Sequence, residues 1–242
     1  MIPAKTKCPG CEPNKCKCPL LALPIFTGVP KTAWESFCKR RVPNTYKKGN
    51  VVFYDGNQPL GMYFVCSGRV KIVKSESGTH SNITRVVEAP DLLGDRAFFA
   101  NEPYRGSGEV MEDARICFID RDSFEQIFLE TPGMARGLLA RMAAELGRAE
   151  ERILDICFKT ARERLAKYIM EKFSESESSG GEGSQIRFSE SRVELAKILD
   201  TSPEALCRTL AEFKSKGWIA VDGRVLRVLD RVRLAQVAGV KA

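Results

Sequence analysis

Two charged side chains near the end of the chain have a spacing that suits the reading of DNA bases. Glu204 and Arg208 lie four residues apart within residues 191–210, which read as a helix, a tight turn and a second helix. Residues four apart share one helical face, so a carboxylate and a guanidinium would project side by side. A helix presenting such a pair fits the major groove of DNA and can reach base edges. The pattern therefore predicts a helix-turn-helix that recognises a DNA sequence.

A second group of residues with chemical potential is a set of cysteines at the start of the chain. The sequence has nine cysteines in all. Four of them fall within the first 18 residues: Cys8, Cys11, Cys16 and Cys18. In a reducing compartment such a cluster more often binds metal than forms disulfides. We therefore expect a metal centre near the N-terminus.

Length and composition bound the class of protein that carries these residues. With 242 residues, 43% of them hydrophobic and 29% charged, the chain has room for two globular domains. No apolar run approaches the roughly 20 residues that span a bilayer, and the N-terminus lacks an apolar signal core. The expected location is therefore the cytoplasm, without membrane contact. A net charge of +7 suits an anionic partner such as double-stranded DNA.

Residues 47–120 show the pattern of an antiparallel β-roll or barrel. Short apolar runs alternate with glycines, which is typical of many short strands joined by turns. The expected strands are Val51–Tyr54, Met62–Val65, Val70–Val73, Ile83–Val87 and Ala114–Ile119. A short helix over residues 30–42 is expected to precede them.

A long helical pattern follows and predicts a dimer. It covers about residues 122–173, with a break near Thr131-Pro132-Gly133. Its second part repeats apolar residues at alternating three- and four-residue steps, as in a coiled coil. These residues are Leu138 or Leu139, Met142, Leu146, Ala149, Ile153 and Ile156. A small roll cannot cover a seam of this length, so we expect it to pair two copies of the chain.

The C-terminal part reads as a winged helix. Residues 174–184, rich in Ser, Gly and Glu, predict a flexible linker or loop. After the helix-turn-helix, Asp222-Gly223 lies between two β-rich runs and suits a type I′ hairpin turn. A helix-turn-helix followed by a hairpin is the order of a winged helix.

The succession of these elements resembles the CRP/FNR family of bacterial transcription factors. The resemblance covers almost the whole chain and rests jointly on residues 48–51, 63–70 and 161–166. It implies an α+β fold with an N-terminal antiparallel β-roll like that of cyclic-nucleotide-binding domains, a long dimerisation helix and a C-terminal winged helix-turn-helix. The implied boundaries are a cysteine-rich sensor segment at 1–22, the β-roll at 23–130, the dimerisation helix at 131–160 and the DNA-binding domain at 161–242.

The resemblance also implies how DNA is read. Arg208 would bond O6 and N7 of a guanine, and Glu204 would accept a hydrogen bond from N4 of a cytosine. Ser191 and Arg192 would hold phosphates. A homodimer would bind an inverted repeat of TTGA-like half-sites about one helical turn apart, and would act together with RNA polymerase.

Three more residues of the second helix bear on this reading. Ser202 is expected to cap the helix and to face the DNA backbone. Cys207 occupies a position where FNR-like members usually have serine. Pro203 stands where CRP-like members often have arginine. The base sequence of the half-site is therefore less closely defined than the class of protein.

For the sensor, the resemblance points first to a [4Fe–4S] cluster. FNR-like members hold it with three N-terminal cysteines and one from the β-roll. Here Cys8, Cys11 and Cys18 would supply three thiolates, with Cys16 as the alternative to Cys18. Cys117 falls where the family has its fourth ligand. Thiolates suit iron sulfide because both are soft, and the protein would then sense oxygen or redox state.

Two other sensors stay open. The four N-terminal cysteines could bind zinc or act as a dithiol switch, which leaves Cys117 without a role. A cyclic nucleotide could instead bind in the roll, where Gly94, Asp95 and Arg105 fall at the family's nucleotide-binding positions. Asp95 stands there in place of the family's glutamate. An enzyme is not expected, because a single histidine and no clustered acids leave no catalytic set.

Ala149 bears on how dimerisation is controlled. FNR-like members keep an acidic residue at this position of the seam, and its repulsion makes pairing conditional. Ala149 has no charge to bury, so the seam is expected to pair more readily. We expect the protein without its sensor group to remain a dimer.

Overall fold

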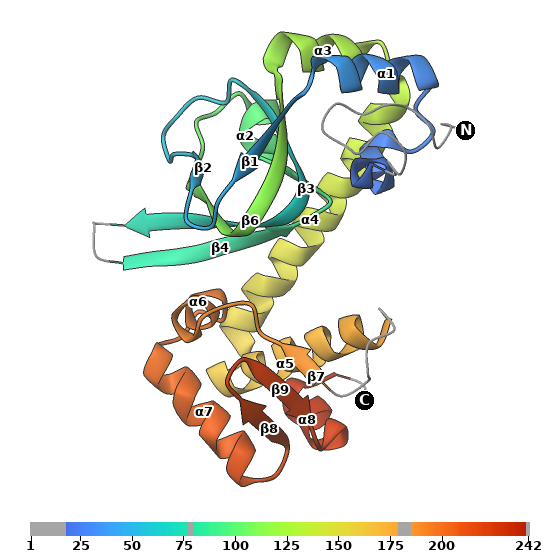
Figure 1. Cartoon of the computed structure of the whole chain (residues 1–242). Helices are drawn as coiled ribbons and strands as arrows, with labels where there is room; N and C mark the ends of the chain where they lie inside the picture. The colour runs from blue at the N-terminus through green and yellow to red at the C-terminus, as the bar shows by residue number, and fades with distance from the viewer. Residues whose placement is uncertain (1–17, 77–79, 179–184, 241–242) are drawn as a thin grey trace. The chain divides into compact units, whose positions relative to one another are not determined.

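One long helix, α4 (Pro132–Phe158), spans the boundary between two units of the chain, which divide between Gly147 and Arg148. The structure is a computed structural model and describes residues 18–76, 80–178 and 185–240 (Figure 1). The expected α+β fold, with roll, long helix and winged helix-turn-helix in this order, is confirmed. Among the helices of the described residues, none combines the length and the apolar character that a membrane span requires.

In the described residues, the roll of the first unit is a six-stranded antiparallel sheet. Its strands are β1 (Val42–Tyr46), β2 (Val51–Phe53), β3 (Gly61–Glu76), β4 (His80–Glu88), β5 (Asp91–Leu93) and β6 (Ser107–Asp120). The hydrogen-bonded order is β1-β6-β3-β4, with β2 also paired to β6 and β5 to β3. The long strands β3 and β6 therefore organise the roll, because they pair with each other and with all the others.

Strand β3 corrects the sequence prediction. Two strands, Met62–Val65 and Val70–Val73, were expected on either side of Gly68, and this was wrong because one strand runs through the glycine. The ladder with β6 shifts register there instead of ending. Such a bulge bends a strand and redirects its side chains without interrupting it. Because successive side chains of a strand point to opposite faces, β3 contributes to both core clusters of the unit.

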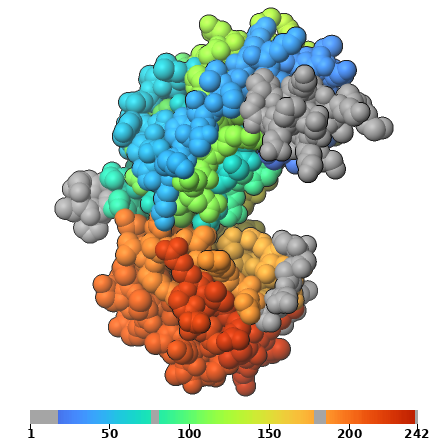
Figure 2. Space-filling view, in the orientation of Figure 1, coloured from blue at the N-terminus to red at the C-terminus, as the bar shows by residue number. Residues whose placement is uncertain are grey.

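Aromatic rings from distant segments build the first of these cores. Phe26, Trp34, Phe37 and Phe64 contact one another with ring centroids 4.8–5.8 Å apart. They come from the turn η2 (Pro24–Phe26), helix α1 (Lys31–Arg40) and strand β3, and α1 also contacts α3 (Arg121–Leu129). Figure 2 shows blue N-terminal segments beside green segments from the middle of the chain on this unit. The N-terminal helices and the roll therefore share one core.

Helix α4 packs against the N-terminal segment at Gly137, where no side chain fits. A Cβ at this position would overlap the carbonyl oxygen of Pro24 and lie 2.6 Å from Cα of Ile25. Helices approach another backbone this closely only where the side chain is missing. The turn η2 is therefore seated directly on the backbone of α4.

Replacing Gly137 by alanine is expected to lower the stability of the first unit by about 1–3 kcal/mol. The methyl group must displace the Pro24–Ile25 backbone, which outweighs the ~1 kcal/mol that alanine gains in helix propensity. Gly147→Ala is the matched control, because a Cβ there meets nothing within 4 Å. Urea unfolding followed by Trp34 fluorescence, in a Trp218→Phe background, reports on this unit. Equal midpoints for the two glycine variants would contradict the packing.

The second unit has the order of a winged helix. After α4 come α5 (Ala161–Ser178), β7 (Gln185–Arg187), α6 (Arg192–Ile198), α7 (Pro203–Ser215), β8 (Ile219–Asp222), β9 (Val225–Val228) and α8 (Arg231–Ala238). The sheet has the order β7-β9-β8, and α5 packs against α8. Leu165, Phe213 and Leu226 are fully buried in their shared core. The helix-turn-helix and the hairpin are thus parts of one packed body.

Helix α5 extends into the stretch 174–184 that was predicted to be a linker or loop. Helix α5 continues to Ser178, so the first residues of that stretch are helical and the prediction was wrong for them. Lys172 pairs with Glu175 at 2.7 Å, a three-residue spacing that supports the last turns. The remainder of the stretch lies outside the described residues.

The hairpin turn also differs from its prediction. Asp222 pairs with Val225, so the turn lies one residue later than Asp222-Gly223. Gly223 is the first central residue and has a φ of 56°. A type I′ turn needs a positive φ at both central residues, and Arg224, the second one, does not have it, so the predicted type I′ was wrong. The hairpin itself is present as predicted.

Candidate functional site

The second helix of the helix-turn-helix, α7, buries one face and exposes the other. Leu206, Leu210 and Phe213 are at most 7% exposed and fix the helix in the core of the unit. Because these residues recur at steps of three and four, they occupy one side of the helix. The predicted DNA-reading residues Glu204, Cys207 and Arg208 are all exposed. The structure therefore presents the carboxylate and the guanidinium to solvent together.

The charges of Glu204 and Arg208 are available to an outside partner. Among the residues that the structure describes, the two do not pair with each other, and Arg208 has no ion-pair or hydrogen-bond partner. Hydrogen bonds from its own backbone amide and from Ser202 hold the pKa of Glu204 below its usual value. The carboxylate is thus ionised at neutral pH and can accept hydrogen bonds. The four-residue spacing would also allow an ion pair between the two side chains within the helix, but the described residues do not form it.

Serine caps fix the starts of both helices. The hydroxyl of Ser202 accepts from the backbone N–H of Ala205 at 3.1 Å, which confirms the predicted cap. Ser191 forms a capping box with Glu194: its hydroxyl accepts from the Glu194 N–H at 3.2 Å, and its own N–H donates to the carboxylate at 3.0 Å. These bonds satisfy backbone groups that a helix start leaves open. The contacts of both serines with the DNA backbone stay predictions.

Arg192, predicted to hold a phosphate, lies beside the hairpin. Its Nη2 donates to the carbonyl of Gly223 at 3.4 Å, and its guanidinium lies 5.6 Å from the centre of the Phe188 ring. A guanidinium has five N–H donors, so a phosphate can bind those that remain. The start of α6 and the tip of the hairpin are therefore tied together.

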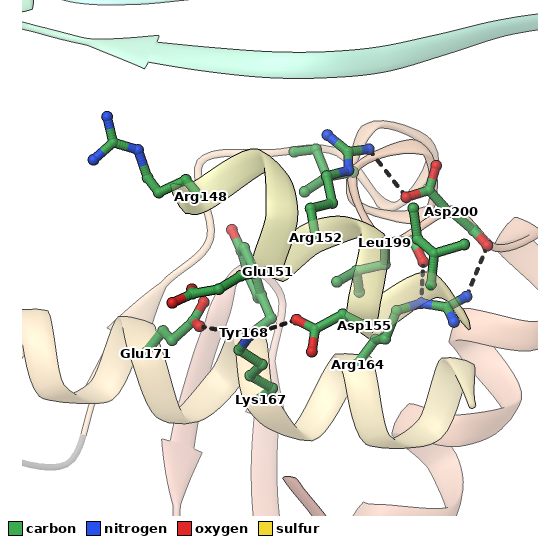
Figure 3. Close-up of a pocket in the computed structure, with 12 residues that line it drawn as sticks. Arg148, Glu151, Arg152, Asp155, Arg164, Lys167, Tyr168, Glu171, Leu199 and Asp200 are labelled. Carbon is green, nitrogen blue, oxygen red and sulfur yellow. Dashed lines mark hydrogen bonds and ion pairs between the residues drawn. The ribbon is translucent and has the colours of Figure 1, made fainter. Parts of the chain in front are cut away.

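Two arginines that sequence reasoning missed hold the turn between α6 and α7. Arg164 donates to the carbonyls of Leu199 and Asp200, both at 3.0 Å. Arg152, on α4, pairs with the Asp200 carboxylate at 3.0 Å (Figure 3). Asp200 has a φ of 49°, in the left-handed region that non-glycine residues rarely adopt. These bonds stabilise the sharp turn that sets the direction of α7.

A charged pocket of about 360 Å³ lies beside this turn. Four basic and four acidic side chains line it. Figure 3 shows Lys167 between two of the acids, and its ammonium bonds Asp155 and lies 3.8 Å from Glu171. Asp155 also pairs with Lys159 at 2.8 Å. The four positive and four negative charges balance, so the pocket has no net charge that would attract an ion. The ion pair of Lys167 with Asp155 links α5 to α4 at this place.

Helix α4 carries an exposed apolar stripe along the predicted seam. Leu146, Ile153 and Ile156 are 62%, 60% and 46% exposed. Ala149, between them, is exposed as well. Met142 is half-buried and packs against the first core. Large apolar side chains in a regular row on one helix face are typical of a surface that a partner covers.

Three cysteines meet in the core of the first unit. Cys18, Cys66 and Cys117 are 5%, 6% and 2% exposed and belong to one core cluster. The Sγ atoms of Cys66 and Cys117 are 3.4 Å apart, and Nη1 of Arg41 donates to Sγ of Cys18 at 3.5 Å. The structure therefore brings together two predicted ligands, Cys18 and Cys117. It adds Cys66, which the alternation of inward residues along β3 could have indicated.

The surroundings of these sulfurs suit thiolate chemistry. The hydrogen bond with Cys66 and the nearby guanidinium of Arg41 together lower the pKa of Cys117 to about 7, against the opposing effect of burial. The same bond, together with burial, raises the pKa of Cys66. Deprotonated sulfur is the form that binds soft metals, and a nearby guanidinium balances the charge of an anionic cluster. The described residues thus provide two sulfurs of the predicted donor set, those of Cys18 and Cys117, near a cation.

The remaining predicted cluster ligands belong to the first 17 residues of the chain. Cys8, Cys11 and Cys16 lie outside the described residues. Within residues 18–76, 80–178 and 185–240, no three histidine, cysteine or acidic side chains are grouped as a metal site. The fit to an iron–sulfur group therefore rests on Cys18, Cys117 and Arg41.

The residues of the alternative effector site line one small pocket. Gly94, Asp95 and Arg105 surround a cavity of about 190 Å³ in the roll. Typical ligand pockets have volumes of roughly 300–1,000 Å³. Arg105 pairs with Glu102 at 3.1 Å and its side chain is 68% exposed. Glu102 also pairs with Arg96 at 2.9 Å, so this one carboxylate offsets the positive charge of Arg105 only in part.

Asp95 has a partner of its own. It is buried and bonds the guanidinium of Arg141 on α4. Arg141 also donates to Asp91 at 2.8 Å, and Arg85 lies 3.8 Å from Asp95. A buried charge is stable only when it is paired in this way. Asp95 thus joins the roll to α4 in this structure.

A roll with a small pocket, a helix with an exposed apolar stripe and a winged helix-turn-helix together define a DNA-binding regulator. Residues 43–131 match the family model of the cyclic nucleotide-binding domain, and residues 163–237 match that of the Crp-like helix-turn-helix domain. The chain belongs to the CRP/FNR family of transcription regulators and is not an enzyme.

Individual relatives match over most of the chain. The CRP-like cAMP-activated global transcriptional regulator of Mycobacterium tuberculosis is 26% identical over 214 residues, which are 88% of this chain and 96% of the relative. Transcriptional activator protein anr of Pseudomonas aeruginosa is 26% identical over 233 residues, 96% of this chain and 94% of the relative. The structure of FixK2 from Bradyrhizobium japonicum has a TM-score of 0.71 at 24% identity, covering 84% of this chain and 99% of that one. This last likeness supports the fold.

Proposed function

We propose that this regulator senses oxygen or redox state through a [4Fe–4S] cluster. The residues that would hold it are Cys8, Cys11, Cys18 (or Cys16) and Cys117. The observation that carries the proposal is the burial of Cys18 and Cys117 in one core beside the Arg41 guanidinium. When bound, the cluster supplies an oxygen-sensitive redox centre.

The chain's own residues link this site to helix α4. Cys18 is followed directly by the turns η1 (Pro19–Ala22) and η2, and η2 is seated on α4 at Gly137. A bond at Cys18 would therefore fix how this segment packs on α4. Because α4 is the helix expected to pair two copies, the state of the cysteines would alter how α4 is held within the dimer rather than whether two copies pair. The homodimer would bind inverted TTGA-like half-sites and act with RNA polymerase in the cytoplasm.

Anaerobic purification tests the sensor. We expect a coloured protein with a broad band near ~400 nm that bleaches in air, and about four iron and four sulfide per chain. Cys117→Ser is expected to lose the band. Cys38→Ser, which alters another buried cysteine of the same core, is expected to keep it. Colourless protein with stoichiometric zinc would replace this proposal by the zinc or dithiol alternative.

A cyclic nucleotide is the second candidate signal. In its favour are the pocket that contains Gly94, Asp95 and Arg105 and the similarity to a relative named as cAMP-activated. Against it stand the ion pairs of Arg105 with Glu102 and of Asp95 with Arg141. Calorimetric titration with cAMP and cGMP distinguishes the two. Binding heat that Arg105→Ala removes would favour the nucleotide.

A further inference from the structure

Cys66 and Cys117 form a close thiol pair, and the proposed cluster employs only one of the two. Their Sγ atoms are 3.4 Å apart. A disulfide bond is about 2.05 Å long, so the sulfurs need to approach by about 1.4 Å to be joined. Rotation about the two Cα–Cβ bonds moves sulfur atoms over such distances without a change in fold. The pair is therefore close to the geometry of a cross-link.

The backbone holds this pair in place. Cys66 belongs to β3 and Cys117 to β6, and these strands are neighbours in the roll. Phe64 is the residue directly opposite Cys117, and the ladder shifts register between Val65 and Ser67. The side chain of Cys66 enters the same core cluster as those of Phe64 and Cys117. The short sulfur–sulfur distance therefore joins neighbouring positions of two paired strands, next to the bulge in β3.

We propose that Cys66 and Cys117 form a reversible disulfide when the protein meets hydrogen peroxide, which makes them a second oxidation site. The inference goes beyond the proposed function and does not depend on it, because both sulfurs belong to the described core of the roll. Cys66 is 6% and Cys117 is 2% exposed. This burial excludes bulky oxidants such as glutathione disulfide, so the proposed oxidant is a small molecule, hydrogen peroxide.

The reaction has two steps and balances with one peroxide. The sulfur of Cys117 attacks one oxygen of hydrogen peroxide, the O–O bond breaks, and the leaving hydroxide takes the Cys117 proton to form water. The sulfur of Cys66 then attacks the resulting sulfenic acid, the S–O bond breaks, and the hydroxide leaves with the Cys66 proton as a second water. Two thiols are oxidised by two electrons, and the peroxide is reduced to two waters.

The cross-link would have two consequences for the protein. It joins β3 to β6 covalently inside the roll. It also occupies Cys117, so the oxidised chain lacks one predicted cluster ligand until a thiol reductant restores it. Peroxide would therefore change the protein through this disulfide, whereas other signals would act on the proposed cluster in the same core.

Peptide mapping of the full-length protein without its metal tests the proposal. Trypsin places Cys66 in the peptide 49–69 and Cys117 in the peptide 116–121, and each peptide has one cysteine. Protein stripped of metal by a chelator is treated with hydrogen peroxide, quenched in acid, unfolded, alkylated and digested without reduction. We expect loss of both alkylated peptides and a joined species lighter by two hydrogens than their sum. Dithiothreitol is expected to restore the separate peptides.

Variants and alternative pairings make the result decisive. Cys66→Ser is expected to abolish the joined species, and Cys38→Ser is expected to leave it unchanged. Cys18 and Cys38 fall in tryptic peptides 18–31 and 32–39, again with one cysteine each. Joining of Cys117 to either of these peptides, or its full alkylation after peroxide treatment, would overturn the proposal. Because the map uses wild-type protein, the result does not depend on whether the variants fold.

A second measurement separates this inference from the proposed cluster. Metal-free protein is oxidised with peroxide and then supplied anaerobically with iron and sulfide, with or without prior dithiothreitol. Loading that requires dithiothreitol supports both ideas. A joined peptide in a protein that never binds iron supports the disulfide and contradicts the cluster. Loading without a joined peptide supports the cluster and contradicts the disulfide.

Discussion

Arg208→Ala is expected to weaken binding to the cognate DNA site by at least about thirtyfold. A bidentate contact between arginine and guanine contributes ~1–3 kcal/mol of discrimination, and a symmetric dimer loses it in both half-sites, about 2–6 kcal/mol in total. The effect is confined to DNA binding because the Arg208 guanidinium forms no ion pair or hydrogen bond within the described residues. Its removal therefore disturbs no contact that supports the fold.

Selection from a random inverted-repeat library, followed by fluorescence anisotropy at fixed salt, measures this effect. Salt must be fixed because phosphate contacts make affinity depend on it. Arg233→Ala is the matched control, because it removes an exposed positive charge from α8 of the same unit. We expect the control to retain the ratio of specific to non-specific affinity. A ratio that Arg208→Ala also leaves unchanged would contradict base reading by this helix.

The second large effect is expected from Ile153→Glu in the seam of α4. The isoleucine is 60% exposed in the single chain, and pairing would bury it in both copies. Burying such a side chain contributes ~1.5–3 kcal/mol per copy, and a carboxylate would instead be desolvated. We expect the dissociation constant of the dimer to rise at least about a hundredfold, with loss of binding to an inverted repeat.

Sedimentation velocity measures the dimer directly. Leu154→Glu is the matched control, because Leu154 is 55% exposed, adjacent in sequence and outside the seam. The control is expected to remain dimeric, and monomers from Leu154→Glu alone would place the seam on another face. The metal-free wild type provides a further test. Since Ala149 adds no charge to the seam, we expect it to stay dimeric, and a monomer after exposure to air would contradict this.

Local patterns allowed much of the DNA-binding unit to be predicted from the sequence. The helix-turn-helix, the cap at Ser202 and the shared exposure of Glu204 and Arg208 all depend on residues within one or two helical turns. Hydrogen bonds and helix periodicity act over that range, so the sequence alone defines them. The order of the strands and helices follows from the same kind of local pattern. The predicted position of the hairpin turn was wrong by one residue, because the pairing of β8 with β9 sets where the turn lies.

The first residue of the seam on α4 could not be predicted from the local pattern. Spacing left Leu138 and Leu139 as equal candidates for its first position. The structure buries Leu138 in the first core and leaves Leu139 69% exposed. Only packing against the N-terminal segment, which approaches α4 at Gly137, distinguishes the two.

The sensor region depended most on tertiary structure. Alternation along β3 could indicate that Cys66 faces the core, but no spacing predicts that it lies 3.4 Å from Cys117, because the pairing of β3 with β6 brings the two together. Likewise, the ion pair of Asp95 with Arg141 joins residues from the roll and from α4. The sequence by itself determined which chemical groups the protein has and which helix presents Glu204 and Arg208. The tertiary structure decided which groups meet, because contacts between distant segments are selected by the packing of the whole core rather than by local geometry.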